Sequence, residues 1–551
     1  MKTNVQEPTS VASENHSTTA AFEALFPKDE EAHHLFRFED IEAELQAFAE
    51  TEKERLGIVE EEVEHWSSGE EVEFTKSQRE TTTILCSGLT YAQDLFVKAA
   101  LSGLGYNIQA LDVPDVEALN LGKEFGNRGQ CNPTYFTVGN LLKHLFHLRD
   151  EKGMSVEEIC EKYVFLTAGA CGPCRFGTYV TEYRKVLHDA GFEGFRVMLF
   201  QQQGGLDQAT GDDMGLEFTP PFFIGILKAL IAGDVLNAVG YRIRPYEVVP
   251  GSTDEALTEC KAMLAHAFEN GTSILRALLR CRKRLNLVEV NRLQSKPKVM
   301  VIGEFWAMTT EGDGNYHLQR FLEQEGAEVD VQLVTAWLLY NIWSHTYDTK
   351  RRQNLRGVDG GRYGLEGKKP TKKLRTMWMA ETALRTVFQT FAKAIGLGQY
   401  KLTDMDKLAE ISHEYYPNEL RGGEGHMEVG KLIQSVEKKK AHMVISVKPF
   451  GCMPSSGVSD GVQSLVVKDY PDAIFCPIET SGDGAVNVHS RVQMFLFKAR
   501  KRAQEEFDAI LEEKGLTLEE ATTKLRKSRS KATYYPKHQV AGTGANALKE
   551  L

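Results

Sequence analysis

Apolar residues recur along this sequence in two patterns, short continuous runs and longer stretches with helical spacing. The runs are rich in β-branched residues and are bounded by glycine, proline or polar residues, which predicts buried strands. They occupy residues 81–86, 163–167, 195–200, 299–303, 328–334, 443–447 and 473–475. Stretches with helical spacing follow or separate these runs at 91–105, 175–190 and 315–326. Such alternation of strand and helix predicts parallel sheets.

The pattern divides the chain into five parts. Residues 1–80 combine a polar leader with an acid-rich helical arm, and residues 213–296 have almost continuous helical spacing. The expected fold class is α/β, with two Rossmann-like parallel-sheet domains, helical insertions and an acidic helical N-terminal arm. The predicted domains are 1–80 (leader and arm), 81–212 (first α/β domain), 213–296 (helical subdomain), 297–500 (second α/β domain, with a helical and basic insertion at 348–438) and 501–551 (helical basic tail).

Composition and charge narrow the class of protein. The 65 basic and 77 acidic side chains give a net charge of -12, so we expect no nucleic-acid binding that depends on attraction by the whole protein. The most apolar stretch, 222–233, is short and interrupted by Lys228, so no membrane span is predicted. Residues 1–20 lack the apolar core of a secretory signal. These features predict a cytoplasmic protein, in which nine cysteines stay reduced and serve metal or redox chemistry.

Four of the nine cysteines are followed by proline within two positions, which is more than chance placement of 17 prolines predicts: Cys131, Cys171, Cys452 and Cys476. Proline and glycine fix a tight turn and direct backbone N–H groups at the sulfur, which suits a thiolate that binds an iron–sulfur cluster. The alternative for each of them is an ordinary structural cysteine. That alternative is the expected one for Cys160, Cys260 and Cys281, which lie inside helical patterns.

The positions of the cysteines relative to the predicted strands predict that several of them lie close together. Five of them lie at or just past strand ends: Cys86, Cys171, Cys174, Cys452 and Cys476. In open parallel sheets the ligand crevice lies beyond those ends, so we expect the five to converge. Cys131 precedes the helix that begins near residue 138, where a helix amino terminus favours a negatively charged group, and we take it as the sixth ligand. A rival interpretation of Cys171-Gly-Pro-Cys174 is a thioredoxin-like redox dithiol.

Carboxylates and a histidine provide candidate catalytic groups. Glu424, His426 and Glu428 fall close together, and a histidine between carboxylates can move protons at neutral pH; polar groups at a helix start are the alternative. Glu304 follows a strand end, and Glu311 and Asp313 come soon after it. The basic run 350–375 is either a solvated loop or a docking site for an acidic partner or for the phosphates of coenzyme A.

Several strings resemble the 2-hydroxyacyl-CoA dehydratase superfamily, which includes dehydratase subunits, double-cubane cluster proteins and cluster proteins associated with ATP-dependent activases. The resemblance spans roughly residues 81–500. It is carried by Gly129-Gln-Cys-Asn-Pro133, Gly172-Pro-Cys-Arg-Phe-Gly-Thr-Tyr179, Gly303-Glu-Phe-Trp306, Gly422-Gly-Glu-Gly-His426 and Lys448-Pro-Phe-Gly-Cys-Met-Pro454.

This resemblance implies a cluster between two Rossmann-like domains, with low-potential electrons delivered by a separate ATPase of the actin-like fold. We find no phosphate-binding motif in this sequence. The string nearest to a P-loop, Gly364-Leu-Glu-Gly-Lys-Lys369, lacks the required spacing. Members of the family use three cysteine ligands per cubane. Six candidate cysteines therefore favour an 8Fe–9S double cubane over a single 4Fe–4S cluster. An acyl-CoA or another small reducible molecule is the implied substrate, and a homodimer is one open form of assembly.

The expected function is reductive chemistry at a cysteine-bound iron–sulfur cluster, with catalytic roles for Glu304, Glu424 and His426. The alternative is a component of an activase complex that only relays electrons or serves as a scaffold, and the third hypothesis is a dithiol oxidoreductase. The sequence leaves the substrate open.

Overall fold

The computed structural model describes residues 74–169, 174–201, 215–353, 369–420, 425–528 and 531–551, with a few isolated residues elsewhere. By its internal contacts the chain divides into residues 1–67 and 68–551, and the second unit is described below. Most of the acidic arm, Cys171, Glu424 and half of the basic run 350–375 lie outside the described residues.

The first sheet has four parallel strands in the order β2-β1-β3-β4. Its strands are β1 (Thr83–Cys86), β2 (Ile108–Ala110), β3 (Tyr163–Gly169) and β4 (Arg196–Gln201). Its helices are α3 (Tyr91–Ser102), α4 (Val116–Phe125), α5 (Asn132–Phe146), α6 (Val156–Lys162) and α7 (Tyr179–Asp189). The predicted parallel α/β arrangement is confirmed here, and the sequence pattern missed only the short edge strand β2, whose three residues are too few to establish a period.

The second sheet repeats this plan in the order β6-β5-β7-β8, again all parallel. Its strands are β5 (Lys298–Gly303), β6 (Glu328–Val331), β7 (Met443–Pro449) and β8 (Phe475–Thr480). The helices around it include α11 (Phe305–Thr309), α12 (Leu318–Gln324), α16 (Gly425–Glu437), α18 (Gln463–Asp469) and α19 (Ala485–Lys514). In both sheets the strand order reverses between the first and third strands of the domain, and parallel sheets hold ligands beyond the strand ends at such a reversal.

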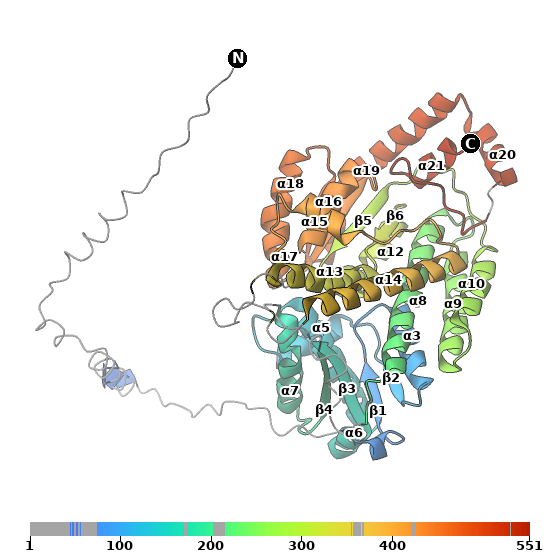
Figure 1. Ribbon diagram of the computed structural model, residues 1–551. Coiled ribbons are helices and arrows are strands. Elements are labelled where there is room, and N and C mark those ends of the chain that lie inside the picture. The colour runs from blue at the N-terminus through green and yellow to red at the C-terminus, as the bar shows by residue number, and fades with distance from the viewer. Residues whose placement is uncertain are drawn as a thin grey trace, which may run out of the picture. The chain divides into compact units, whose positions relative to one another are not determined.

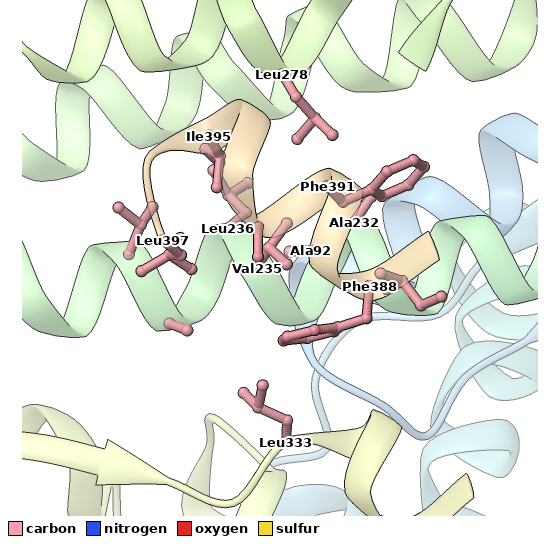
Figure 2. Packing of buried hydrophobic residues seen from close by; sticks show 14 of the residues in the cluster. Ala92, Ala232, Val235, Leu236, Leu278, Leu333, Phe388, Phe391, Ile395 and Leu397 are labelled. Carbon is pink, nitrogen blue, oxygen red and sulfur yellow. The ribbon is translucent and has the colours of Figure 1, made fainter. Parts of the chain in front are cut away.

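A layer of long helices joins the two sheets. It contains α8 (Pro220–Ile243), α9 (Ser252–Glu269), α10 (Ile274–Leu285), α13 (Val334–Arg352), α14 (Pro370–Ile395) and α15 (Met405–Ser412). Figure 1 shows α13 and α14 crossing between the first sheet and the second. Phe388, Phe391 and Ile395 of α14 pack against Val235 and its neighbours on α8 (Figure 2).

Helix α8 differs from the sequence expectation. It runs unbroken through Lys228, and it is long and apolar enough to cross a membrane, with a mean hydropathy of 1.8 over its most apolar window. However, 56% of that window is buried inside the protein, where α8 packs on α3, α9 and α14. Its apolar character is explained by this central position in the helical layer.

The predicted boundaries at the end of the chain were wrong. The boundary at 500 falls in the middle of α19, one continuous helix that ends at Gly515 in the left-handed conformation. The segment after residue 531 is packed rather than solvated, because Arg292 Nη2 donates to the carbonyl of Ala532 at 2.6 Å and the Tyr535 hydroxyl donates to Glu328 Oε1 at 2.6 Å. The last helix, α21 (Thr543–Lys549), is buried along most of its length.

Candidate functional site

Two cysteine-bearing turns, one from each sheet domain, touch each other. Cys131 precedes α5, and Cys452 precedes the short helix α17 (Met453–Ser456). The backbone N–H of Asn132 donates to the carbonyl of Phe450 at 3.0 Å, and the Asn132 side chain donates to the carbonyl of Thr480 at 2.9 Å. The turn that carries Cys131 is therefore held directly against the carboxyl ends of β7 and β8.

Glycine makes this close approach sterically feasible. Gly451 has a φ of 76°, and a Cβ atom there would lie 2.9 Å from the carbonyl oxygen of Gln130 and 3.2 Å from the Cα of Cys131. An L side chain would be strained by the backbone conformation and would also collide with the facing backbone. Gly451 thus positions Cys452 beside the Cys131 turn.

The sulfur of Cys131 lies in a polar niche within an otherwise apolar core. Its Sγ is 3.0 Å from the Tyr179 hydroxyl oxygen and 3.2 Å from the Thr134 Oγ1, both within hydrogen-bonding distance. Cys131 is also the residue that caps the amino terminus of the 15-residue helix α5. Hydroxyl donors and a helix amino terminus both stabilise negative charge on sulfur.

Cys452 is buried, with 8% of its surface exposed, and faces carboxyl groups. Burial raises the pKa of its thiol strongly, and the nearby Glu304 and Cys131 raise that pKa further. Hydrogen bonds from Ser455 act in the opposite direction. Without a cation or metal beside it, Cys452 is therefore a neutral thiol, and a bound metal would have to displace its proton.

Cys174 stands near the same turns. It caps the 3-10 helix η4 (Arg175–Thr178), and the next residue, Arg175, donates from Nη1 to the carbonyl of Gly129, two residues before Cys131. The same guanidinium nitrogen lies close to the Gly451 position. Cys131, Cys174 and Cys452 therefore each begin a helical turn. Arg175 links the turn at Cys174 to the turns at Cys131 and Cys452.

The other two predicted ligands lie elsewhere. Cys86 ends β1 and packs with Ile84 in one apolar cluster, whereas Cys131 packs with Leu85 in another. Because successive strand residues point to opposite faces, Cys86 is on the wrong face of the sheet to join Cys131.

Cys476 is also misplaced by the sequence prediction. It is the second residue of β8 rather than a residue past a strand end, and it is fully buried in the apolar core with Val492 and Leu496. The carboxyl end of β8 at Thr480 is four residues further on, or roughly 13 Å at the usual rise per residue. The prediction that six cysteines converge was therefore wrong for Cys86 and Cys476.

Two carboxyl groups, the half-buried Glu304 and the buried Glu428, lie on the Cys452 side of the site. Glu304 directly follows β5, where its side chain accepts the N–H of Ala307 at 2.8 Å and caps α11; burial raises its pKa. Glu428 on α16 is 2% exposed, and burial together with Glu304 raises its pKa to about 8. Its carboxyl oxygens accept hydrogen bonds from Ser446 and Ser455, each at 3.4 Å. At neutral pH Glu428 holds a proton.

His426 does not have the environment expected of a proton shuttle. Its ring stacks on Trp343, with centroids 4.5 Å apart, and lies against Tyr340 at 4.8 Å. Burial lowers its pKa to about 3, and within the described part of the chain its Nε2 finds no hydrogen-bonding partner. His426 is therefore neutral at physiological pH, and its described ring contacts are aromatic side chains. Glu424 lies outside the described residues.

Glu311 and Asp313 have structural roles. The Glu311 carboxylate accepts the N–H of Tyr91 at 2.7 Å, and Asp313 accepts the N–H of Val116 at 3.0 Å. Tyr91 and Val116 begin α3 and α4 of the first domain. The acidic loop of the second domain that carries Glu311 and Asp313 therefore caps two helices of the first. No local sequence signal marks Thr134, Ser446 and Ser455, which reach the site only through tertiary packing. Tyr179 stood in the quoted Gly172–Tyr179 string without a role assigned to it.

The donor set fits an iron–sulfur cluster in its chemistry. Soft thiolate ligands at helix starts, with hydroxyl groups beside the sulfur, are suited to a negatively charged cluster. Across the residues that the structure describes, no three cysteine, histidine or acidic side chains are placed to hold a single metal ion. A polynuclear cluster spaces its ligands more widely than one ion does, and Cys171 is outside that part of the chain.

No protein-family model matches this sequence, and a comparison with curated proteins finds no similar protein.

Proposed function

We propose that Cys131, Cys174 and Cys452, together with Cys171, hold one 4Fe–4S cluster between the two sheet domains. In this proposal the chain is a cytoplasmic protein of the 2-hydroxyacyl-CoA dehydratase type with two Rossmann-like domains. It receives low-potential electrons from an ATP-dependent activase and uses them to reduce an acyl-CoA or another small molecule. The observation that carries the proposal is the contact between the Cys131 and Cys452 turns, sealed by Asn132 and Gly451.

The loss of Cys86 and Cys476 from the ligand set favours one cubane over a double cubane. Four candidate cysteines remain, which is the number of thiolates that a 4Fe–4S cluster takes when the protein supplies every ligand. Three of them occupy the position just before a helical turn, where backbone N–H groups lack partners within the helix. When bound, such a cluster accepts and passes on single electrons at low potential.

The surrounding residues supply hydrogen bonds and a neutral carboxylic acid. The hydroxyl groups of Tyr179 and Thr134 lie beside the Cys131 sulfur and offset its negative charge. Glu428, with a pKa of about 8, is a neutral carboxylic acid linked toward Cys452 through Ser455. Negative charge at Cys452 raises the pKa of Glu428 further. Glu428 therefore stays neutral and does not repel that charge.

The first experiment is iron and acid-labile sulfide analysis of protein purified or reconstituted without oxygen. We expect about four iron atoms per chain. Cys131→Ala and Cys452→Ala should lose most of the iron, whereas Cys476→Ala and the matched control Cys160→Ala should retain it. Iron-free wild-type protein, or equal iron in all variants, would contradict the proposal, and about eight irons would restore the double cubane.

A second experiment separates an enzyme from an electron relay. The cluster-loaded chain is mixed with a purified activase, ATP and a reductant, and then with acyl-CoA or a small reducible molecule. Reduction or dehydration that depends on the chain supports the enzyme proposal. Oxidation of the activase without any turnover assigns the chain to the relay class.

A further inference from the structure

We propose that a second site, independent of the cysteine pocket, binds a small phosphate-bearing anion. The site is a cavity of about 280 Å³ on the α16 side of the second sheet. It is lined by Arg242 of α8, Lys298 and Met300 of β5, Asp330 of β6, Lys401, Lys431 of α16, Lys440, Tyr400, Tyr535 and His538, among others. Its size suits a small molecule rather than a macromolecule.

The charges in the lining are unbalanced. Five basic side chains, Arg242, Lys298, Lys401, Lys431 and Lys440, share the lining with a single acidic side chain, Asp330. Lys298 is partly offset by Glu328, whose Oε1 lies 3.6 Å from the lysine Nζ. Within the described residues no carboxylate lies at ion-pairing distance from Lys431 or Lys440, and Lys440 Nζ instead donates to Gln434 Oε1 at 2.6 Å. The cavity therefore carries a positive charge that the protein does not neutralise.

Removing the charged groups of these lysines from water costs free energy. Burial lowers the pKa of Lys431 to about 8, and it also lowers the pKa of Lys440, even though Asp330 acts in the opposite direction in both cases. Lys431 and Lys440 are half-buried, and partly buried charges without an opposite charge gain little for stability, which is typical of sites that bind an anion. An anion in the cavity would compensate them.

Arg242 lines the cavity, and its guanidinium lies against two aromatic rings. Its guanidinium lies over the Tyr535 ring at 3.9 Å and over the Tyr400 ring at 5.1 Å, which fixes its plane. Its Nη1 is buried and, in the described part of the protein, has no hydrogen-bonding partner. A planar guanidinium in the lining of a cavity matches the oxygen atoms of a phosphate group.

The site is separate from the cysteine pocket. Lys298 begins β5, whereas Glu304 follows its end, so the two sites are separated by roughly 20 Å along that strand. The exposed residues Lys401 and His538 lie at the mouth of the cavity, and Lys298, Lys431 and Lys440 lie deeper. The excess of about three positive charges favours pyrophosphate or a nucleoside diphosphate over a single phosphate.

Isothermal titration calorimetry with pyrophosphate tests the proposal. We expect saturable binding with one site per chain, tighter than binding of inorganic phosphate or of a phosphate monoester. Lys431→Gln and Lys440→Gln should each weaken pyrophosphate binding about tenfold, the usual loss for one charge-assisted hydrogen bond. The matched control Lys372→Gln, an exposed lysine on α14, should leave the affinity unchanged.

Two further measurements test whether a loss of affinity comes from the proposed site rather than from damage to the fold. Lys431→Gln removes an uncompensated charge, so the ligand-free variant should melt at or above the wild-type temperature while binding more weakly. Binding should also take up a proton near pH 8, seen as a dependence of the measured heat on the ionisation enthalpy of the buffer. The groups that face Lys431 in the cavity are Asp330, Lys440, Lys298, Arg242, Lys401, Tyr400, Tyr535 and His538.

Failure of pyrophosphate, phosphate and monoester alike to bind would overturn the proposal. Binding that is equally strong in Lys431→Gln, Lys440→Gln and Lys372→Gln would also overturn it, because the anion would then lie elsewhere. Neither result depends on whether the cysteines hold iron.

Discussion

The Tyr179 hydroxyl oxygen lies 3.0 Å from the sulfur of Cys131, although the two residues are 48 positions apart in the sequence. Tyr179 is the first residue of α7, and Cys131 caps α5, so the contact joins the starts of two helices of the first domain. Burial raises the pKa of Tyr179 well above its usual range, and the Cys131 sulfur raises it further. The phenol therefore keeps its proton and can donate it to the sulfur.

Replacing Tyr179 by phenylalanine removes this donor while keeping the ring. The metal-free variant should lose about 1 kcal/mol in free energy of unfolding, measured by urea denaturation. If Cys131 binds a cluster, the reduction potential should become more negative, because a hydrogen bond to sulfur favours the reduced state. The matched control is Tyr183→Phe on the same helix, whose hydroxyl bonds Thr137 and Thr167. It should lose similar stability without a change in potential; equal potentials in both variants would contradict the role given to Tyr179.

A side chain at Gly451 should separate the two cysteine turns. Gly451→Ala is expected to destabilise the fold by at least about 1–2 kcal/mol, from the left-handed backbone alone, and to reduce iron incorporation. Gly457→Ala is the control, because a Cβ atom there meets nothing within 4 Å and its φ is -63°. Denaturation and iron analysis of the two variants provide the comparison. Full iron content in Gly451→Ala would show that the approach of the turns is not needed.

Glu428 should make stability fall as the pH rises. Its folded pKa of about 8 lies above the ordinary 4.5, so the unfolded chain releases this proton first. The contribution is complete below pH 4.5 and is lost through pH 8, with a slope of up to about 1.4 kcal/mol per pH unit. Glu428→Gln should remove that slope from urea denaturation curves, and the exposed Glu410→Gln should preserve it. An unchanged slope in Glu428→Gln would assign the titration to another group.

His426→Phe should be tolerated. The phenylalanine ring retains the stacking on Trp343 and eliminates a buried nitrogen that has no described partner, so the free energy of unfolding at pH 7 should stay level or rise by about 1 kcal/mol. His426 has a lowered folded pKa, so its contribution is present above pH 6.5 and is lost as the pH falls toward 3. The variant should therefore lose less stability in acid. A large loss of stability at pH 7 would reveal a hydrogen bond to Nε2.

The parallel sheets were predictable because buried strands have a local signature. Runs such as Val299–Gly303 are apolar, β-branched and bounded by breakers, and both sheets follow from them. Strand ends are less well specified: the run at 473–475 predicted a strand ending before Cys476, but β8 begins at Phe475 and continues to Thr480. Pro477 does not end the strand, since β8 is an edge strand and proline is tolerated there.

The site was only partly predictable for a related reason. Proline and glycine beside Cys131 and Cys452 are a local signal, and the structure brings the two turns together. Which face of a strand a cysteine occupies depends on register and packing, so Cys86 carried the same signal as a ligand would. The cation-lined cavity draws Arg242, Asp330, Lys431 and Tyr535 from distant segments, and no spacing in the sequence connects them.

The acidic loop that caps α3 and α4 has a consequence for how the molecule can move. Swinging one sheet away from the other would expose the amino termini of both helices at once, each at a cost of about 1 kcal/mol. Glu311 and Asp313 therefore oppose separation of the two sheets, and we expect the Cys131 and Cys452 turns to keep their contact whether or not a ligand is bound.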